Sequence, residues 1–123
     1  MSLYDEIGRE FIEKAVREFY TRAVQDPIIG HFFFKVDVES LILKQIAFTC
    51  KLLGEKGGAG LKAAPLKSVH GPLGIRGPHF ARRQKLMGMV LDDMGLRKEW
   101  RDAWLHLEFQ LKPLIISKAS APS

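Results

Sequence analysis

The chain has only one cysteine, Cys50, among its 123 residues. A single cysteine cannot close a disulfide within the chain, and it supplies only one of the several ligands that a structural zinc site needs. The sequence therefore excludes a disulfide framework and is typical of a protein from a reducing compartment. Because Cys50 has apolar neighbours in the middle of a predicted helix, we interpret it as a packed, inert thiol.

Long hydrophobic runs are also missing. The longest nearly apolar stretch, residues 28–34, is interrupted by Gly30 and His31. It is far shorter than the roughly 20 residues that cross a bilayer. The first six residues lack the basic region and apolar run of a secretory signal. We therefore expect no membrane span, and we expect a cytoplasmic protein.

Basic charge is in excess but is not clustered. Nineteen Lys and Arg residues against 14 Asp and Glu give a formal net charge of +5, which favours an anionic partner. The basic residues are scattered among carboxylates, however, and no aromatic-rich RNA-binding motif or DNA recognition helix is present. We expect a solvated basic surface and no nucleic-acid partner.

Neither the alternation of a β-strand nor a hairpin turn occurs, so the sequence predicts an all-α fold. Hydrophobic residues at 46% and charged residues at 27% are ordinary globular values. The length corresponds to one domain, which we assign to residues 1–123 with residues 117–123 as a flexible tail.

Apolar residues at helical spacing predict four longer helices, one each within residues 11–24, 38–53, 77–94 and 100–114. Asp26-Pro27 ends the first helix, because proline disfavours the α conformation at the residue before it. Asp37 is the expected N-cap of the second. A shorter helix is predicted between Pro65 and His70, after a glycine-rich loop.

Two polar residues, Tyr20 and Gln45, lie within the apolar stripes of the first and second helices. A buried hydroxyl or amide without a partner costs on the order of 1–3 kcal/mol, so both side chains must meet something polar. One interpretation is a Tyr–Gln hydrogen bond inside an ordinary core. The other is a pair of donors that converge on a small polar ligand in an apolar pocket.

Four histidines are present, and none forms the i, i+4 pair of a helical zinc site, which excludes metalloprotease chemistry. From their positions alone, His79 and His106 are interpreted as structural or surface residues. His70 differs because it ends a short helix just before Gly71-Pro72. One histidine on a short rigid helix is how a globin holds haem iron from the proximal side.

Residues 3–116 resemble the truncated haemoglobins, and the resemblance is closest to group 1 of that family. The segments that carry it are the Leu3-Tyr4-Asp5-Glu6-Ile7-Gly8 opening, Phe19-Tyr20 followed by Asp26, Phe32-Phe33, Lys44-Gln45 with Phe48, Val69-His70, and His79-Phe80. The spacing between these segments also matches that of the family.

This resemblance implies a two-on-two helical sandwich that holds haem b between its helices. It implies that His70 is the iron ligand, that Phe33 packs against the porphyrin, and that Tyr20, Leu41 and Gln45 line the distal pocket. The further cofactor contacts that it implies are Lys44, Phe48, His79 and Phe80.

The resemblance further implies reversible binding of O₂, NO and CO. Donors such as Tyr20 and Gln45 stabilise a partly anionic ligand, so we expect high oxygen affinity and slow release. Oxygen binding, storage or sensing fits these properties. So does reaction of bound O₂ with NO to give nitrate, which needs an external reductase because the sequence has no flavin or nicotinamide site.

Two alternatives remain open. Lys44 is expected to pair with a haem propionate, but direct coordination of the iron by its amine would make the chain a six-coordinate redox protein. The second alternative is a haem-free helical interaction module with a basic face.

Arg83 departs from the family pattern, because it falls where relatives have an apolar residue on the proximal side of the haem. We expect either a local rotation of this helix or an arginine that reaches toward solvent.

Overall fold

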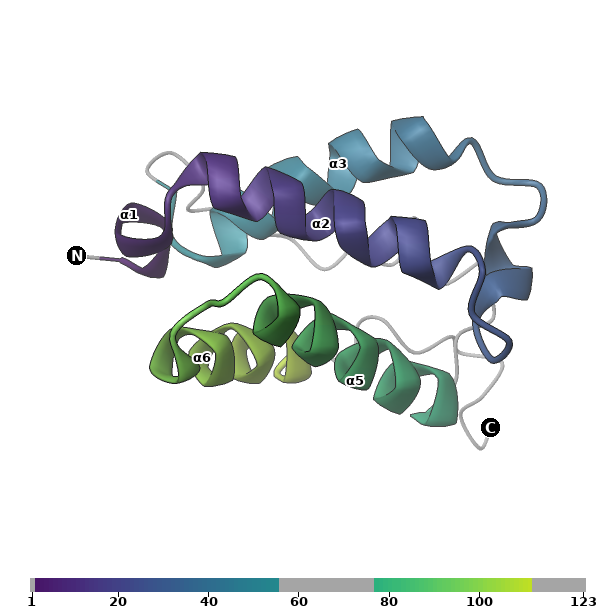
Figure 1. Cartoon of the computed structure of the whole chain (residues 1–123). Coiled ribbons are helices and arrows are strands. Elements are labelled where there is room, and N and C mark those ends of the chain that lie inside the picture. Colours follow the sequence, from purple (N-terminus) through teal and green to yellow (C-terminus); the bar gives the residue numbers. More distant parts are fainter. Residues whose placement is uncertain (1, 56–76, 112–123) are drawn as a thin grey trace, which may run out of the picture.

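The computed structural model describes residues 2–55 and 77–111, and within these ranges every regular element is a helix. The elements in chain order are α1 (Leu3–Ile7), α2 (Arg9–Ala23), the 3-10 helix η1 (Gly30–Phe33), α3 (Val38–Leu52), α5 (Gly77–Asp93) and α6 (Lys98–Phe109). The all-α prediction is confirmed. Helices α2 and α3 form one layer, α5 and α6 form the other, and α2 packs on α5 (Figure 1).

The longer helices begin close to the predicted positions, and α2, α3 and α5 also end close to them, whereas α6 ends at Phe109, before the predicted residue 114. Helix α3 starts after Asp37, whose carboxylate accepts a hydrogen bond from the Ser40 amide at 3.1 Å, as an N-cap residue does. Helix α5 starts at Gly77, immediately before Pro78, and the chain after it turns at Gly95, which has a φ of 78°. These start and stop signals are local, which explains why the sequence reveals them.

The short helix α1 was not predicted, because five residues are too few for a periodic pattern. A capping box holds it: the Ser2 hydroxyl accepts from the Asp5 amide at 3.2 Å, and the Asp5 carboxylate accepts from the Ser2 amide at 3.5 Å. The Tyr4 amide donates to the Leu53 carbonyl at 2.8 Å. Helix α1 is thereby fixed to the end of α3.

Gly54 lets the chain leave α3 directly beside α1. Its φ is 110°, a region that favours glycine, and a Cβ at this position would collide with the side chain of Ser2. Glycine is therefore required both by the backbone angle and by the close approach of the N-terminal segment.

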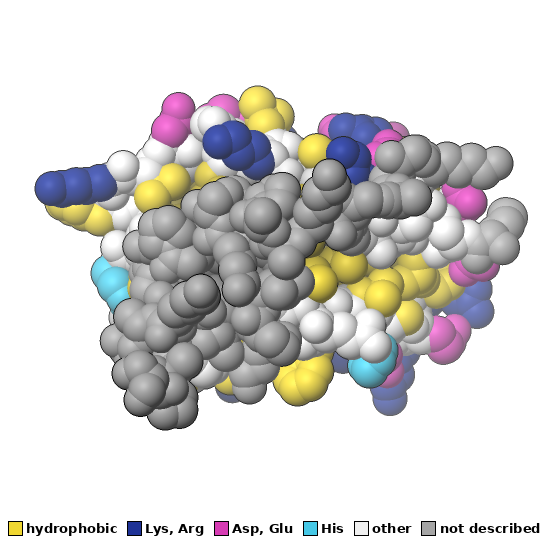
Figure 2. Space-filling view, turned by 180° about the vertical axis from the view of Figure 1, so that it is seen from behind, with side chains coloured by type: hydrophobic (Ala, Val, Ile, Leu, Met, Phe, Trp, Pro, Cys, Tyr) yellow, Lys and Arg dark blue, Asp and Glu magenta, His cyan; other side chains and the backbone are white. Residues whose placement is uncertain are grey.

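In Figure 2 a group of hydrophobic side chains lies in the right half of the view, and most of the basic and acidic side chains lie toward the edge. Several of the charged residues form exposed ion pairs, such as Arg9 with Glu13 at 2.9 Å and Arg22 with Asp93 at 2.8 Å. No helix within residues 2–55 and 77–111 is long and apolar enough to cross a membrane.

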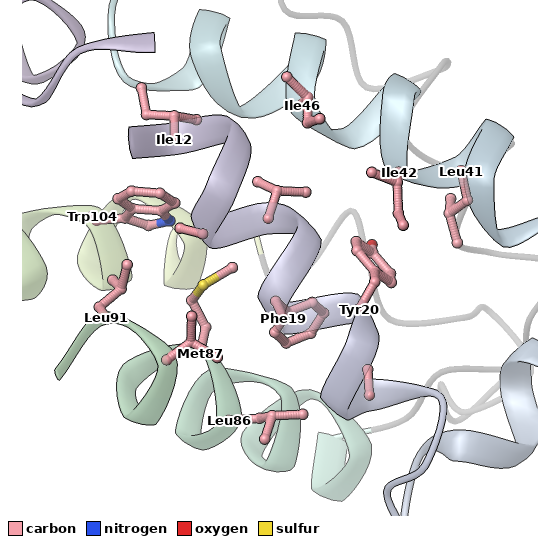
Figure 3. Packing of buried hydrophobic residues seen from close by; sticks show 14 of the residues in the cluster. Ile12, Phe19, Tyr20, Leu41, Ile42, Ile46, Leu86, Met87, Leu91 and Trp104 are labelled. Atoms are coloured by element: carbon pink, nitrogen blue, oxygen red, sulfur yellow. The ribbon is translucent and has the colours of Figure 1, made fainter. Parts of the chain in front are cut away.

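The core lies between the two layers and is built around large side chains that are at most 2% exposed. These include Ile12, Phe19, Met87, Leu91 and Trp104. Each contributes roughly 1.5–3 kcal/mol by leaving water. In Figure 3 Phe19 points from α2 toward Leu86 and Met87 on α5, whereas its neighbour Tyr20 points toward Ile42 and Leu41 on α3. Tyr20 thus brings a phenol to the α3 side of this same buried cluster.

Candidate functional site

Tyr20 is buried on α2, with 3% of its surface exposed. Its ring meets the rings of Phe19 and Phe33 edge to face, with centroid distances of 4.9 Å and 5.7 Å. Burial raises the pKa of Tyr20 to about 12, although the nearby Arg83 guanidinium opposes this rise. The phenol is therefore neutral at physiological pH, and its hydroxyl keeps a proton to donate.

Leu41 and Gln45 lie one turn apart on α3, with 7% and 5% of their surfaces exposed. Residues four apart share one face of a helix, and α3 packs against α2. The prediction that Tyr20 and Gln45 are both buried is thus confirmed. Thr49, one turn beyond Gln45, adds a third buried polar side chain to the same face.

Phe33 belongs to η1 and is half-buried against the Tyr20 ring. The Tyr20 ring on α2 and the Phe33 ring on η1 therefore meet, and α3, which carries Gln45, packs against α2. Apolar side chains with a small number of hydrogen-bond donors are the composition of a small-ligand pocket.

Lys44 and Phe48 lie beside this face on α3. Lys44 is exposed, as expected from its rotation of about 100° from Gln45, and Phe48 is half-buried. The lysine side chain is thus at the margin of the helix face that carries Gln45.

His79 and Phe80 open helix α5 and have different surroundings. His79 is half-buried, and its ring meets those of Phe32 and His31 at centroid distances of 4.8 Å and 5.7 Å. Phe80 is 1% exposed, and its ring lies 6.4 Å from that of Phe109. His79 thus contacts η1 through Phe32, the residue that precedes Phe33 in the chain. The predicted iron ligand, His70, lies outside the described residues.

Arg83 does not reach solvent, so the expectation of a solvent-directed arginine is wrong. Its side chain is 12% exposed, and its guanidinium donates to Glu108 on α6 at 3.0 Å. The guanidinium also lies over the Phe19 ring, 5.2 Å from its centroid. An inward arginine is possible here because a buried carboxylate on the neighbouring helix offsets the cost of removing its charge from water.

Glu108 is the residue of this region that the sequence analysis missed. It is 3% exposed, and its second oxygen accepts from the Trp104 indole at 3.1 Å. The available signal was a glutamate four residues after a tryptophan on the apolar stripe of the last helix. A buried carboxylate requires buried hydrogen-bond donors, and Arg83 was the basic residue whose surroundings the sequence left unexplained.

A second buried carboxylate, Asp26, organises the turn between α2 and η1. It accepts from the amides of Ile28 and Ile29 at 2.8 Å and 3.2 Å, and from Arg82 on α5 at 2.6 Å. Hydrogen bonding to Arg82 lowers the pKa of Asp26, and the two backbone amides add to this effect against the opposing effect of burial. The turn that leads to Phe33 is thus anchored to α5.

Residues 2–115 match the family model for bacterial-like globins, and the chain belongs to that family. It is 33% identical over 91 residues to group 1 truncated haemoglobin LI410 of Chlamydomonas moewusii, an alignment that covers 72% of this chain and 52% of that protein. It is 38% identical over 80 residues to group 1 truncated haemoglobin GlbN of Mycolicibacterium paratuberculosis, covering 64% and 57%. The matches thus span little more than half of each curated relative.

Solved structures show the same architecture. Truncated haemoglobin from Tetrahymena pyriformis in the Fe(III) form superposes with a TM-score of 0.85 at 19% identity, covering 96% of this chain and all of that one. Chlamydomonas reinhardtii THB1 superposes with a TM-score of 0.77 at 30% identity, covering 93% and 95%. The chain is a group 1 truncated globin with the two-on-two helical fold, and its family implies a haem cofactor.

Proposed function

We propose that this globin holds haem b and binds diatomic gases reversibly, with high affinity for O₂. The observation that carries the proposal is the burial of two hydrogen-bond donors, Tyr20 and Gln45, on facing helices amid apolar side chains. Ferrous haem with one neutral histidine ligand supplies an open coordination position for O₂, NO or CO. The two side chains supply the donors for the ligand.

The surroundings of the two donors suit a haem pocket. Leu41 and Phe33 offer apolar surface beside them, and exposed Lys44 at the margin of the same helix is suited to pair with a propionate. Phe48, His79 and Phe80 are the further contacts in this proposal, and His70 is the iron ligand. Tyr20 and Gln45 then form the distal side of the pocket.

Hydrogen bonds from neutral donors to a partly anionic ligand are stronger than those between two neutral groups. They favour O₂ over CO, because O₂ accumulates more negative charge on its outer atom. Slow release suits oxygen storage or sensing better than bulk delivery. Oxidation of NO to nitrate, with electrons from an external reductase, is the enzymatic extension of this proposal.

The test begins with the absorption spectrum of the purified protein, because a haem-free interaction module would show no Soret band. The ligand role is tested by stopped-flow measurement of O₂ dissociation in wild type and Tyr20→Phe. With roughly 1–2 kcal/mol for the lost hydrogen bond, dissociation is expected to accelerate about tenfold, with little change in CO association.

The matched control is Tyr4→Phe, which removes the same hydroxyl from the other tyrosine of the chain, on α1. Its O₂ dissociation rate is expected to equal that of wild type. Equal rates in wild type and Tyr20→Phe would leave Tyr20 as a core residue only.

A further inference from the structure

The 3-10 helix η1 is in close contact with the end of α2 and with the start of α5. At Gly30 it approaches α2 so closely that a Cβ would lie 2.9 Å from the carbonyl oxygen of Val24. Toward α5, the Phe32 ring meets the His79 ring edge to face, with centroids 4.8 Å apart. The first turn of α5 thus contacts the short helix that carries Phe33.

A partly buried ion pair makes a second connection between α5 and this corner of the fold. Arg82 lies three residues after His79 and hence on the same face of α5. It donates to Oδ2 of Asp26 through Nε at 2.9 Å and through Nη2 at 2.6 Å. The other oxygen, Oδ1, accepts from the amides of Ile28 and Ile29. One carboxylate oxygen therefore holds α5, and the other holds the turn that leads into η1.

Stability alone does not account for this pair, in which the Asp26 side chain is 3% exposed and that of Arg82 is 25% exposed. A buried ion pair is often no more stabilising than well-packed apolar side chains of the same volume. Unlike an apolar side chain, however, the carboxylate accepts four directional hydrogen bonds from two separate segments. It therefore fixes the position of the turn relative to α5.

The geometry of η1 carries this position to the Tyr20 ring. A 3-10 helix has three residues per turn, so successive side chains project about 120° apart. Phe32 faces His79 on α5, whereas the next residue, Phe33, meets Tyr20 on α2. The Phe33 and Tyr20 rings are 5.7 Å apart at an interplanar angle of 90°. The position of η1 thus decides where the phenol finds this aromatic neighbour.

We propose that Arg82 is a positioning residue for the ligand side of the haem pocket: by binding Asp26 it fixes η1, so that the Phe33 ring holds the Tyr20 phenol in one orientation. This inference rests on the proposed function, because it specifies how the donor to the bound gas is kept in place. A hydrogen bond weakens steeply as its angle departs from linear, so a phenol that can turn is a poorer donor. Arg82 acts through η1 and does not touch the ligand.

A purely structural role predicts something different. If the ion pair only joins α5 to the turn, its loss lowers the melting temperature but leaves the Tyr20 ring against Phe33. Arg82→Met removes the connection to α5 while Asp26 still accepts from the two amides. The double variant Arg82→Met/Asp26→Asn leaves no unpaired buried carboxylate, and the new amide oxygen can still accept from the turn. It is therefore expected to fold.

The direct readout is the nuclear Overhauser cross-peak between the ring protons of Tyr20 and Phe33, measured in the diamagnetic carbonmonoxy protein. The chain has two tyrosines, so a Tyr4→Phe background leaves Tyr20 as the only tyrosine signal. Phe33→Leu identifies the cross-peak by its disappearance. We expect the cross-peak to be present when Arg82 is present and to be lost in both Arg82 variants.

The functional readout is O₂ dissociation, expected to accelerate about threefold to tenfold in both Arg82 variants, as for one hydrogen bond that is weakened or lost. In a Tyr20→Phe background the Arg82 substitutions should have no further effect. Arg22→Met is the matched control, because Arg22 also joins α2 to α5, through Asp93 at 2.8 Å, but at the other end of α5. It should change neither readout.

An unchanged cross-peak in both Arg82 variants would overturn the proposal. So would O₂ dissociation that Tyr20→Phe accelerates but the Arg82 variants do not, or that the Arg82 variants accelerate equally with and without the Tyr20 hydroxyl. The two proposals fail separately. If Tyr20→Phe leaves O₂ dissociation unaltered, the ligand role of Tyr20 is wrong, whereas the cross-peak still decides whether Arg82 positions the phenol.

Discussion

Tyr20 and Phe19 differ by one hydroxyl group, yet their side chains point to different neighbours of helix α2. Phe19 faces the apolar core toward α5, and Tyr20 faces α3, where Gln45 and Thr49 are also buried (Figure 3). A phenol inside an apolar core costs free energy unless its hydroxyl has a hydrogen-bond partner. At the scale of single residues, the candidate site therefore consists of buried polar side chains, each of which requires a hydrogen-bond partner.

His70 is expected to be the iron ligand. In His70→Ala the bond that fixes the haem is absent, so haem retention after gel filtration should fall sharply and the five-coordinate histidyl-iron signature should vanish. His79→Ala is the matched control. His79 already has aromatic neighbours in Phe32 and His31, and its loss should leave that signature in place. The reverse pattern would assign iron ligation to His79.

Lys44 is expected to decide whether the ligand-free iron gains a sixth ligand. It is exposed and rotated about 100° from Gln45, which directs its stem to the pocket margin and its ammonium toward a propionate. A proton and a metal compete for the same amine lone pair, so lysine ligation should appear only as the pH rises. The measurement is a titration of the ferric absorption spectrum from neutral to alkaline pH in wild type and Lys44→Ala.

Lys51, which is also exposed on α3, provides the control variant Lys51→Ala, expected to titrate like wild type. A low-spin six-coordinate species that is complete at neutral pH and lost in Lys44→Ala would contradict propionate pairing. That result would move the function toward electron transfer.

At the scale of elements, the turn between α2 and η1 determines where Phe33 lies. Asp26 caps this turn and joins it to Arg82 on α5, so one carboxylate connects three elements. Asp26→Asn is expected to lower the free energy of unfolding by about 2 kcal/mol near neutral pH, because bonds to a charged group are replaced by weaker ones.

Asp26→Asn should also make the free energy of unfolding less dependent on pH in the acid range. The folded-state pKa of Asp26 lies below its ordinary value of 3.8, so its contribution is complete above that value and is lost as the pH falls through the lower folded pKa. Urea unfolding from about pH 5 to about pH 2 measures this loss. Asp93→Asn, which breaks the exposed pair with Arg22, should keep the wild-type slope; an unchanged slope in Asp26→Asn would contradict the assignment.

The extents of the helices were predictable because their signals are local. Apolar periodicity predicted α2, α3, α5 and α6, and the Asp37 cap and the Gly77-Pro78 start placed two of their ends. Helix α1 was missed because its only signal is a capping box over five residues. The 3-10 geometry of η1 was not predicted either, since it depends on the Asp26 contacts to the following backbone.

The candidate site was predictable only in part. Tyr20 and Gln45 stood out because each is a polar residue on an apolar helical stripe. Their meeting at one region depends on how α2 packs against α3, which the sequence indicated only through resemblance to a family. Arg83 was misjudged because its direction is set by Glu108, which is 25 residues further along the chain and on another helix. A contact between residues so far apart in the chain leaves no periodic pattern in the sequence.

At the scale of the whole molecule, the largest buried side chains and the proposed ligand donors lie at different helix interfaces. The core between α2, α5 and α6 contains fully buried side chains that pack on one another, including Phe19, Leu91 and Trp104. The donors proposed for the ligand lie between α2 and α3. Leu41, Ile42 and Ile46 of α3 belong to the same buried cluster, so the packing of α2 on both α3 and α5 holds the fold together with any cofactor.

Removal of the haem is accordingly expected to destabilise the protein without unfolding it. A ligand that binds only the folded state stabilises it by about 4 kcal/mol when its concentration is a thousandfold above its dissociation constant. For a domain of this size, that corresponds to a melting temperature about 10–20 °C lower in the apoprotein. The far-ultraviolet circular dichroism of the apoprotein should still report most of the helix content, and calorimetry should still show one cooperative transition.

Two variants distinguish the contributions of core and cofactor. Trp104→Phe removes part of the shared core and the indole donor to Glu108, so it should lower the melting temperatures of the apoprotein and the haem-bound protein by similar amounts. His70→Ala should lower only that of the haem-bound protein, because its proposed partner is the iron. An apoprotein that melts without cooperativity would mean that the side chains buried between α2, α5 and α6 do not suffice to hold the fold, and that the haem is part of its core.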